Sequence, residues 1–280
     1  MRFSLKNNFL FSVVIPTLNN RNEYLKEAIN SIEKQSLVPS EVIIVNNGKG
    51  DLNIEKSSLN IQQFKIVFKG GVAQARNFGA SLANGKYIAF LDDDDLWGQN
   101  YLKKMKESIE SNDPDCLIGR LDQYKNNKIM PYKNAHHMIT KNIILVRNPG
   151  ITGSSVIIKK DVFLKIGGYN VQLITGEDKS LILELIYKNF KINTVPESQA
   201  IIRKSEIKRL SNSENMYDGV LKFYNIYKDK MHFRQKITNL YKIYKHLWMF
   251  KKSIFSGLIY LFFYLCILPE RLIKKINKKN

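Results

Sequence analysis

Apolar residues recur with two alternating periodicities between residues 11 and 202. Short runs rich in β-branched and aromatic residues predict strands over 11–16, 41–48, 64–68, 86–91 and 115–124. Helical spacing predicts helices over 22–35, 71–85 and 100–111, and a helix followed by a strand over 177–195. Residues 153–170 predict a strand, a short helix and a glycine turn, residues 125–150 predict loops, and helical patterning resumes near residue 214. This alternation predicts an α/β fold with a Rossmann-like, mostly parallel central sheet flanked by helices.

The first, second and fourth predicted strands end in polar residues. Thr17 follows the first strand, Asn46 and Asn47 lie at the end of the second, and the aspartates at 92–95 follow the fourth. Ligands of open parallel sheets bind beyond the carboxyl ends of the strands. We therefore expect these side chains to face one crevice.

The stretch YIAFLDDDDLW (87–97) places four carboxylates directly after a buried strand. Four adjacent like charges repel, so they either form a solvated turn or surround a cation. Carboxylate oxygens are suitable ligands for Mg²⁺ or Mn²⁺. Because the aspartates follow a buried strand, we favour the cation over the solvated turn.

Cysteine and histidine residues add no metal or disulfide pattern. Cys116 and Cys266 lie far apart in unlike contexts, as expected in a reducing compartment. The four histidines, His136, His137, His232 and His246, show no ligand spacing. Residues 1–17 lack the small-residue cleavage site of a secretory signal.

The positive charge is concentrated near the C-terminus. The 280 residues carry a formal net charge of +19, and residues 222–280 hold 14 Lys or Arg against two acids. A basic tail is often simply solvated, but it can also bind nucleic acid or an anionic membrane surface. The tail's apolar stretch makes a nucleic-acid partner the weaker hypothesis.

An apolar stretch without charges, SIFSGLIYLFFYLCIL (253–268), lies within this basic region. As a helix it would be roughly 24 Å long, short for a hydrocarbon core about 30 Å thick. Lysines and an arginine flank it on both sides, so the charges indicate no orientation across a bilayer. We expect a helix lying in the cytoplasmic leaflet, with a single span or a buried core helix as alternatives.

Six segments follow one another along the chain: VVIPTLNN, IIVNNGKGD, GVAQARNFGASLANGKYIAFLDDDDLW, GSSVIIKKDVFLKIGGYN, GEDKSLILELIYKNFKI and RKSEIKRLS. In sequence and in order they resemble the inverting family 2 glycosyltransferases of the GT-A fold. The resemblance covers roughly residues 11–211, and we divide the chain into a GT-A domain, 1–212, and a basic helical extension, 213–280. It implies a nucleotide-sugar donor, a UDP-sugar above others, a divalent cation and transfer with inversion. An Asp-x-Asp also occurs in haloacid-dehalogenase-like phosphatases, but Leu96 and the late position of the motif disfavour that alternative.

The resemblance also implies roles for individual residues. Its Asp-x-Asp signature falls on Asp92 and Asp94 as metal ligands, with Asp92 and Asp93 near the donor. Its general base falls on the acidic pair Glu177 and Asp178, with Asp178 preferred; two helix-capping residues are the alternative. The donor-binding positions that it implies are Pro16, Thr17, Asn46 and Arg76, and its candidate diphosphate contacts are Arg203 and Arg209.

Two positions depart from the family pattern. Relatives commonly have an acid where this chain has Asn46, and many have a histidine where it has Ser205.

Taken together, the motifs and the basic apolar tail predict a metal-dependent inverting glycosyltransferase. We expect it to extend a saccharide or lipid-linked saccharide in surface polysaccharide synthesis at the inner face of the cell membrane. A degenerate relative that binds a nucleotide sugar or a partner without turnover is the alternative.

Overall fold

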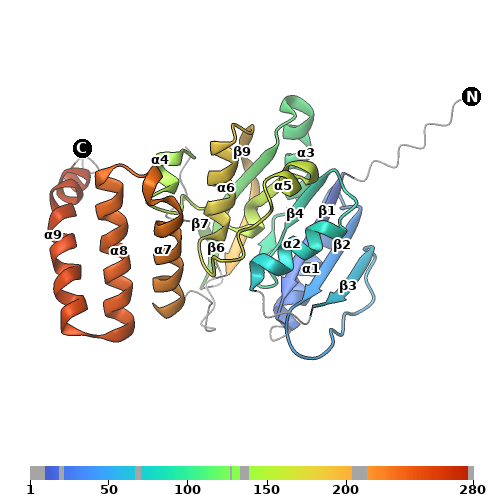
Figure 1. The fold of residues 1–280 in the computed structure, drawn as a ribbon. Helices are drawn as coiled ribbons and strands as arrows, with labels where there is room; N and C mark the ends of the chain where they lie inside the picture. Colours follow the sequence, from blue (N-terminus) through green and yellow to red (C-terminus); the bar gives the residue numbers. More distant parts are fainter. Residues whose placement is uncertain are drawn as a thin grey trace, which may run out of the picture.

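The computed structural model describes residues 10–18, 22–66, 71–126, 128–132, 139–203 and 213–276 (Figure 1). The strands are β1 (Phe11–Thr17), β2 (Glu41–Asn46), β3 (Ile61–Lys65), β4 (Tyr87–Phe90), β5 (Leu96–Trp97), β6 (Cys116–Lys125), β7 (Lys128–Pro131), β8 (Val156–Lys159) and β9 (Ile192–Arg203). The helices are α1 (Asn22–Glu33), α2 (Val72–Leu82), α3 (Tyr101–Asn112), α4 (Lys141–Ile144), α5 (Lys160–Lys165), α6 (Glu177–Tyr187), α7 (Ser213–Tyr227), α8 (Phe233–Lys251) and α9 (Ile254–Ile276). Two 3₁₀ turns, η1 (Gly153–Ser155) and η2 (Lys228–Lys230), complete the described elements.

The described strands form one mixed sheet in the order β3-β2-β1-β4-β8-β6-β9-β5, and β7 pairs with β6. Strands β3, β2, β1 and β4 run parallel, which brings their carboxyl ends to one edge. Strand β8 is antiparallel to both β4 and β6, whereas β6 and β9 are parallel. The predicted α/β sheet is therefore confirmed, with a parallel half that positions the site and a mixed half beside it.

Helices cover both faces of the parallel half. On one face of the sheet, residues such as Val14 and Phe90 pack in a core with α2, α5 and α6. On the opposite face, residues such as Val13 and Ala89 pack in a second core with α1 and α3. This alternation gives the near-continuous apolar strands of the sequence, because both faces are buried.

Helix α2 approaches the sheet closely through Gly79. A Cβ at this position would lie 2.5 Å from Cγ1 of Val14 and 3.0 Å from Cγ2 of Val45. The small residues of α2 therefore allow the contact, and they bring Arg76 of the same helix to the edge where the strands end.

The three long C-terminal helices lie side by side at the end of the molecule opposite β3 (Figure 1). Helix α7 is part of the core that α6 helps to form, because Phe223 and Tyr227 are buried in it. Helix α8 packs between α7 and α9, with stacked rings of Trp248 and Tyr260 5.6 Å apart. No helix among the described residues combines the length and apolar character needed to cross a membrane.

The structure corrects several boundaries. The third strand spans 61–65 rather than 64–68, and the helix predicted to Gly85 ends at Leu82. The stretch predicted as loops contains β7 and α4, and the last strand continues to Arg203 instead of ending near 195. Strand β5, directly after the aspartates, was not predicted.

Candidate active site

A cavity of about 500 Å³ opens at the carboxyl ends of β1 and β4. Most of the predicted site residues line it: Pro16, Thr17, Arg76, Asp92, Asp93, Asp94, Glu177 and Asp178. They come from β1, α2, the turn after β4 and the start of α6, which are far apart in sequence. The expected common crevice is therefore present.

The four aspartates form a tight turn in which alternate side chains are buried. The Asp95 N–H donates to the carbonyl of Asp92 at 3.1 Å. Asp93 and Asp95 are 8% and 4% exposed, whereas Asp92 and Asp94 are more open. The Thr17 hydroxyl donates to Asp93 at 2.7 Å, which ties the turn to β1.

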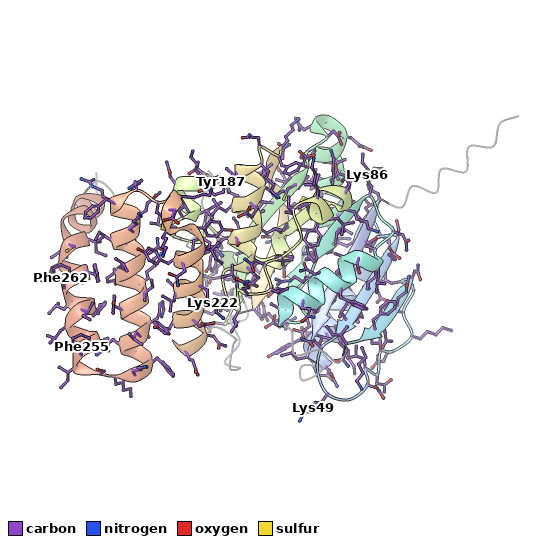
Figure 2. The ribbon with its side chains drawn as sticks, in the orientation of Figure 1. Lys49, Lys86, Tyr187, Lys222, Phe255 and Phe262 are labelled. Carbon is purple, nitrogen blue, oxygen red and sulfur yellow. The ribbon has the colours of Figure 1, made fainter. Side chains whose placement is uncertain are left out.

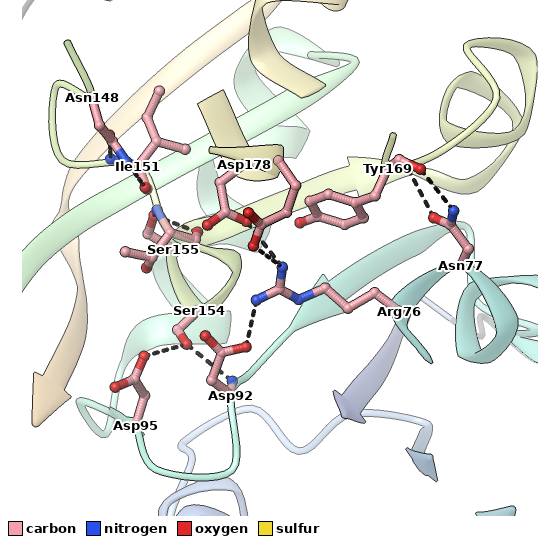
Figure 3. Close-up of polar contacts among 12 residues, drawn as sticks. Arg76, Asn77, Asp92, Asp95, Asn148, Ile151, Ser154, Ser155, Tyr169 and Asp178 are labelled. Carbon is pink, nitrogen blue, oxygen red and sulfur yellow. Dashed lines mark hydrogen bonds and ion pairs between the residues drawn. The ribbon is translucent and has the colours of Figure 1, made fainter. Parts of the chain in front are cut away.

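Ser154 of η1 fixes the other side of this turn (Figure 3). Its hydroxyl donates to Asp95 at 2.7 Å and accepts from the Asp92 N–H at 3.0 Å. Its carbonyl accepts from the Trp97 ring N–H at 2.7 Å. The alternation leaves Asp92 and Asp94 as the members of the turn best placed to face a ligand.

Arg76 reaches from α2 into the centre of this group and is 2% exposed. Its Nη2 donates to Asp92 at 2.6 Å, and its Nη1 donates to Glu177 at 3.2 Å and to Asp178 at 3.1 Å (Figure 3). The guanidinium also lies 5.0 Å from the centre of the Tyr169 ring. One cation thus joins the turn after β4 to the first turn of α6.

Glu177 and Asp178 begin α6 directly after Gly176, which has φ +84° and occupies the N-cap position. The two carboxylates lie in the first helical turn and point to Arg76, so the alternative that they cap the helix is not what the structure shows. The positive end of the helix dipole favours their ionised forms.

Burial and mutual repulsion oppose ionisation in this cluster. Burial, followed by the charge of Glu177, raises the pKa of Asp178 well above its usual value, while Arg76 acts in the opposite direction. Burial also raises the pKa of Glu177. For Asp95, burial and the charges of Asp92 and Asp94 raise the pKa well above normal. For Arg76, burial disfavours the charge, but the surrounding carboxylates still hold its pKa well above normal.

The carboxylates of the cavity are suitable ligands for a divalent cation that is also bound by a diphosphate. No group of three or more His, Cys, Asp or Glu side chains in the described part of the chain is arranged to hold a metal ion. Mg²⁺ commonly binds through one or two carboxylates together with substrate phosphates and water, so a two-carboxylate site is sufficient. Asp92 and Asp94 have that chemistry, and both line the cavity.

Two predicted binding residues lie elsewhere. The Asn46 side chain is buried in its own loop, where it accepts from the Gly48 N–H at 2.8 Å and donates to the Gly50 carbonyl at 2.9 Å. Asn47 lines the cavity instead. The Asn46 side chain therefore shapes this loop and does not line the cavity.

Arg203 is also held away from the cavity. Its guanidinium is paired with Glu27 of α1 and lies 5.0 Å from the centre of the Tyr24 ring. Its backbone N–H donates to Asp95 at 3.3 Å, so it supports the aspartate turn rather than facing a diphosphate. Arg209, Ser205, His136 and His137 lie outside the described residues.

Sequence reasoning missed the residues of η1 and the loop before α6 that frame the cluster. Gly153 packs against Arg76 so closely that a Cβ there would lie 2.6 Å from Cζ of the guanidinium. Ser154 and Tyr169 are buried around the same group. The segments GSS and GGYN were visible in the sequence, but only the folded chain shows that they meet Arg76.

Comparison with known proteins identifies the family. The model for glycosyl transferase family 2 matches residues 12–167, more than half of the chain. The chain belongs to this family. The match includes the aspartate turn and Arg76, whereas Glu177, Asp178 and the C-terminal helices lie beyond its end.

Two curated relatives support the assignment of the chain to family 2. It is 35% identical over 121 residues to the glycosyltransferase GlyG of Streptococcus pneumoniae, an alignment that covers 41% of this chain and 40% of GlyG. It is 26% identical over 186 residues to WfgD of Escherichia coli, a UDP-Glc:α-D-GlcNAc-diphosphoundecaprenol β-1,3-glucosyltransferase, covering 65% of this chain and 72% of WfgD.

Among solved structures, S. aureus TarS (1–349) in complex with UDP-GlcNAc superposes with a TM-score of 0.64 at 19% identity. The superposition covers 91% of this chain and 79% of the TarS fragment, which confirms the GT-A fold.

Proposed function

We propose that the family 2 chain transfers a sugar, with inversion, from a UDP-sugar to a saccharide built on a lipid carrier, in the synthesis of a bacterial surface polysaccharide. The observation that supports this most is the convergence of Arg76, the aspartate turn and the Glu177–Asp178 pair in one cavity. WfgD acts on a diphosphoundecaprenol acceptor, and the TarS structure contains UDP-GlcNAc, which favours these substrate classes.

In this proposal the donor occupies the β1 side of the cavity. Pro16, Thr17 and Asn47 would contact the nucleoside, and Asp92 and Asp94 would lie at the diphosphate. These two aspartates would hold a Mn²⁺ or Mg²⁺ ion. The ion would neutralise negative charge on the leaving nucleoside diphosphate.

Asp178 would act as the general base. It takes the proton of the acceptor hydroxyl while that oxygen forms a bond to the anomeric carbon. The bond from this carbon to the diphosphate oxygen breaks on the opposite face, and its electron pair leaves with the diphosphate. One displacement of this kind inverts the anomeric configuration.

The C-terminal helices suggest where the reaction takes place. Six large apolar side chains on one face of α9 are each about half exposed or more: Ile254, Phe255, Leu258, Leu261, Phe262 and Leu265. Figure 2 shows Phe255 and Phe262 on the outer side of α9. Together with the basic residues of this region, such a face suits peripheral binding to an anionic bilayer. We propose attachment to the inner face of the cell membrane.

A donor screen would test the proposed activity. The protein is incubated with Mn²⁺ and individual nucleotide sugars, and released nucleotide is measured with and without a lipid-linked saccharide acceptor. We expect release with a UDP-sugar, stimulated by the acceptor, and loss of release with EDTA. Binding of UDP-sugars without any release under these conditions would instead favour the non-catalytic alternative.

A further inference from the structure

The strongest unexplained feature of the site is that both terminal nitrogens of the Arg76 guanidinium bind protein carboxylates, whereas its buried Nε has no hydrogen-bond partner among the described residues. Its two terminal nitrogens contact Asp92, Glu177 and Asp178, and the side chain is 2% exposed. An arginine that binds a diphosphate directly needs its N–H groups directed at the ligand. These N–H groups are directed instead at the side chains on either side of the expected reaction centre.

The surroundings of Arg76 hold the guanidinium in this position. The Tyr169 ring lies on one side, 5.0 Å away, and Gly153 leaves room for the group where any larger residue would collide with it. Asn77, the next residue of α2, fixes the Tyr169 backbone through two hydrogen bonds of 2.9 and 2.8 Å (Figure 3). The arrangement has the rigid supporting contacts typical of pre-organised sites.

The charges of the surrounding carboxylates explain why a fixed guanidinium is needed at this position. The carboxylates of Asp92, Glu177 and Asp178 are 27%, 10% and 15% exposed, and they converge on one guanidinium that is 2% exposed. Without the Arg76 guanidinium, Glu177 and Asp178 would repel each other and Asp92. The first turn of α6 would also lose its link to the turn after β4. A base must lie within hydrogen-bond reach of the acceptor hydroxyl, so even a small displacement would reduce the rate.

We propose that Arg76 is a positioning residue, which sets the separation between Asp92 at the donor and Asp178 at the acceptor by binding both. This inference rests on the proposed function, since it takes Asp178 as the base and Asp92 as a donor-side residue. It differs from the role expected from the family resemblance, in which Arg76 contacts the donor itself.

The first test compares Arg76→Lys and Arg76→Met with the wild-type protein. Loss of base positioning should lower kcat, by roughly 10²–10³-fold for Met, within the range for general-base catalysis. Lysine keeps the charge but cannot bridge three carboxylates in a fixed fork, so we expect partial rescue, with a kcat roughly tenfold below wild type. UDP affinity, measured by calorimetry, should stay within about threefold.

A second variant displaces the guanidinium without removing it. A methyl group at Gly153→Ala would push against Arg76, so kcat should fall while the net charge and UDP affinity are unchanged. The control Arg120→Met removes an arginine that pairs with Asp122 at 3.0 Å outside the cavity, and it should leave kcat unchanged. Circular dichroism and thermal unfolding would show that each variant is folded.

The outcomes distinguish a failure of the positioning role from a failure of the proposed function. If Arg76→Met loses UDP affinity at least tenfold while kcat is retained, Arg76 is a donor contact and the positioning role is wrong. If folded Arg76→Met and Gly153→Ala both turn over like wild type, the contacts of Arg76 with the three carboxylates have no role in catalysis. If the wild-type protein itself neither hydrolyses nor transfers any UDP-sugar, the proposed function fails.

Discussion

At the residue scale, the turn after β4 gives its four aspartates different tasks. Asp93 and Asp95 are buried and accept hydrogen bonds from Thr17 and Ser154 respectively. Asp92 and Asp94 are more open. The open positions of Asp92 and Asp94 in the cavity wall therefore follow from the contacts that hold Asp93 and Asp95 inside a hydrogen-bonded turn.

Replacing Asp94 by alanine should abolish transfer without unfolding the protein. Asp94 lies on the cavity wall and is only partly buried, so its removal affects cation binding more than packing. We expect no measurable transfer with Mn²⁺ and a change in the free energy of unfolding within about 0.5 kcal/mol. Asp51→Ala, at an exposed aspartate outside the cavity, is the matched control. Wild-type turnover in Asp94→Ala would contradict the metal assignment.

Asp178→Asn should lower kcat by roughly 10²–10⁴-fold while donor affinity stays nearly constant, because the amide keeps the shape but cannot accept the proton. Single-turnover kinetics and UDP titration would measure the two effects separately. Glu177→Gln should be less damaging. The reverse order would identify Glu177 as the base.

The pH dependence of the wild-type enzyme follows from the raised pKa of Asp178. A base must be deprotonated to act, so kcat/KM should rise with pH through this pKa, at values above the usual aspartate range. A profile that is flat across and above the ordinary aspartate range would show that no buried carboxyl group acts as the base.

At the element scale, the prediction of strands succeeded where an apolar run is buried on both faces of the sheet. Strands β1, β2 and β4 were predicted because both of their faces pack against helices. Strand β5 has only two residues and depends on pairing with Ala200 and Ile201, about a hundred positions later. Its formation, like the contact of Gly153 with Arg76, depends on tertiary neighbours that no local pattern can show.

Gly79→Ala tests the close contact of α2 with the sheet. Alanine is intrinsically better in a helix by roughly 1 kcal/mol, but here its Cβ would be forced against Val14 and Val45. Overpacking of this kind typically costs about 1–3 kcal/mol, so we expect net destabilisation in urea unfolding. Ser81→Ala, on the exposed side of the same helix, should change stability by less than about 0.5 kcal/mol. A more stable Gly79→Ala protein would show that the sheet yields easily at this point.

At the scale of the whole molecule, α7 and α8 connect the cavity to α9. Met216 lines the cavity, and Gly219 packs against Thr175 just before α6. Further along α7, the Tyr227 hydroxyl lies 2.7 Å from that of Ser180. The division of the chain at residue 212 stays a prediction, but α7 contributes to the wall of the site. An acceptor held at a bilayer beside α9 would thus approach a cavity that α7 helps to form.

The membrane proposal predicts that three substitutions on α9 release the protein from lipid without affecting the cavity. Phe255→Glu, Leu258→Glu and Phe262→Glu replace side chains that are 72%, 61% and 61% exposed, so the fold should tolerate them. Burial of each large apolar side chain contributes roughly 1.5–3 kcal/mol, and the triple variant should bind at least about 100-fold more weakly to phosphatidylglycerol-containing vesicles. Co-sedimentation measures the binding.

The matched control carries the same three-charge change outside the C-terminal helices, at Val38, Leu164 and Val171, which are also more than half exposed. Its vesicle binding should stay close to that of the wild type, because its added charges lie away from the apolar face of α9. The α9 variant should keep donor hydrolysis and transfer to a short water-soluble acceptor, but lose transfer to a lipid-linked acceptor in vesicles, since only the latter substrate is concentrated at the bilayer. If both triple variants bind vesicles equally well, the apolar face of α9 is not the membrane contact.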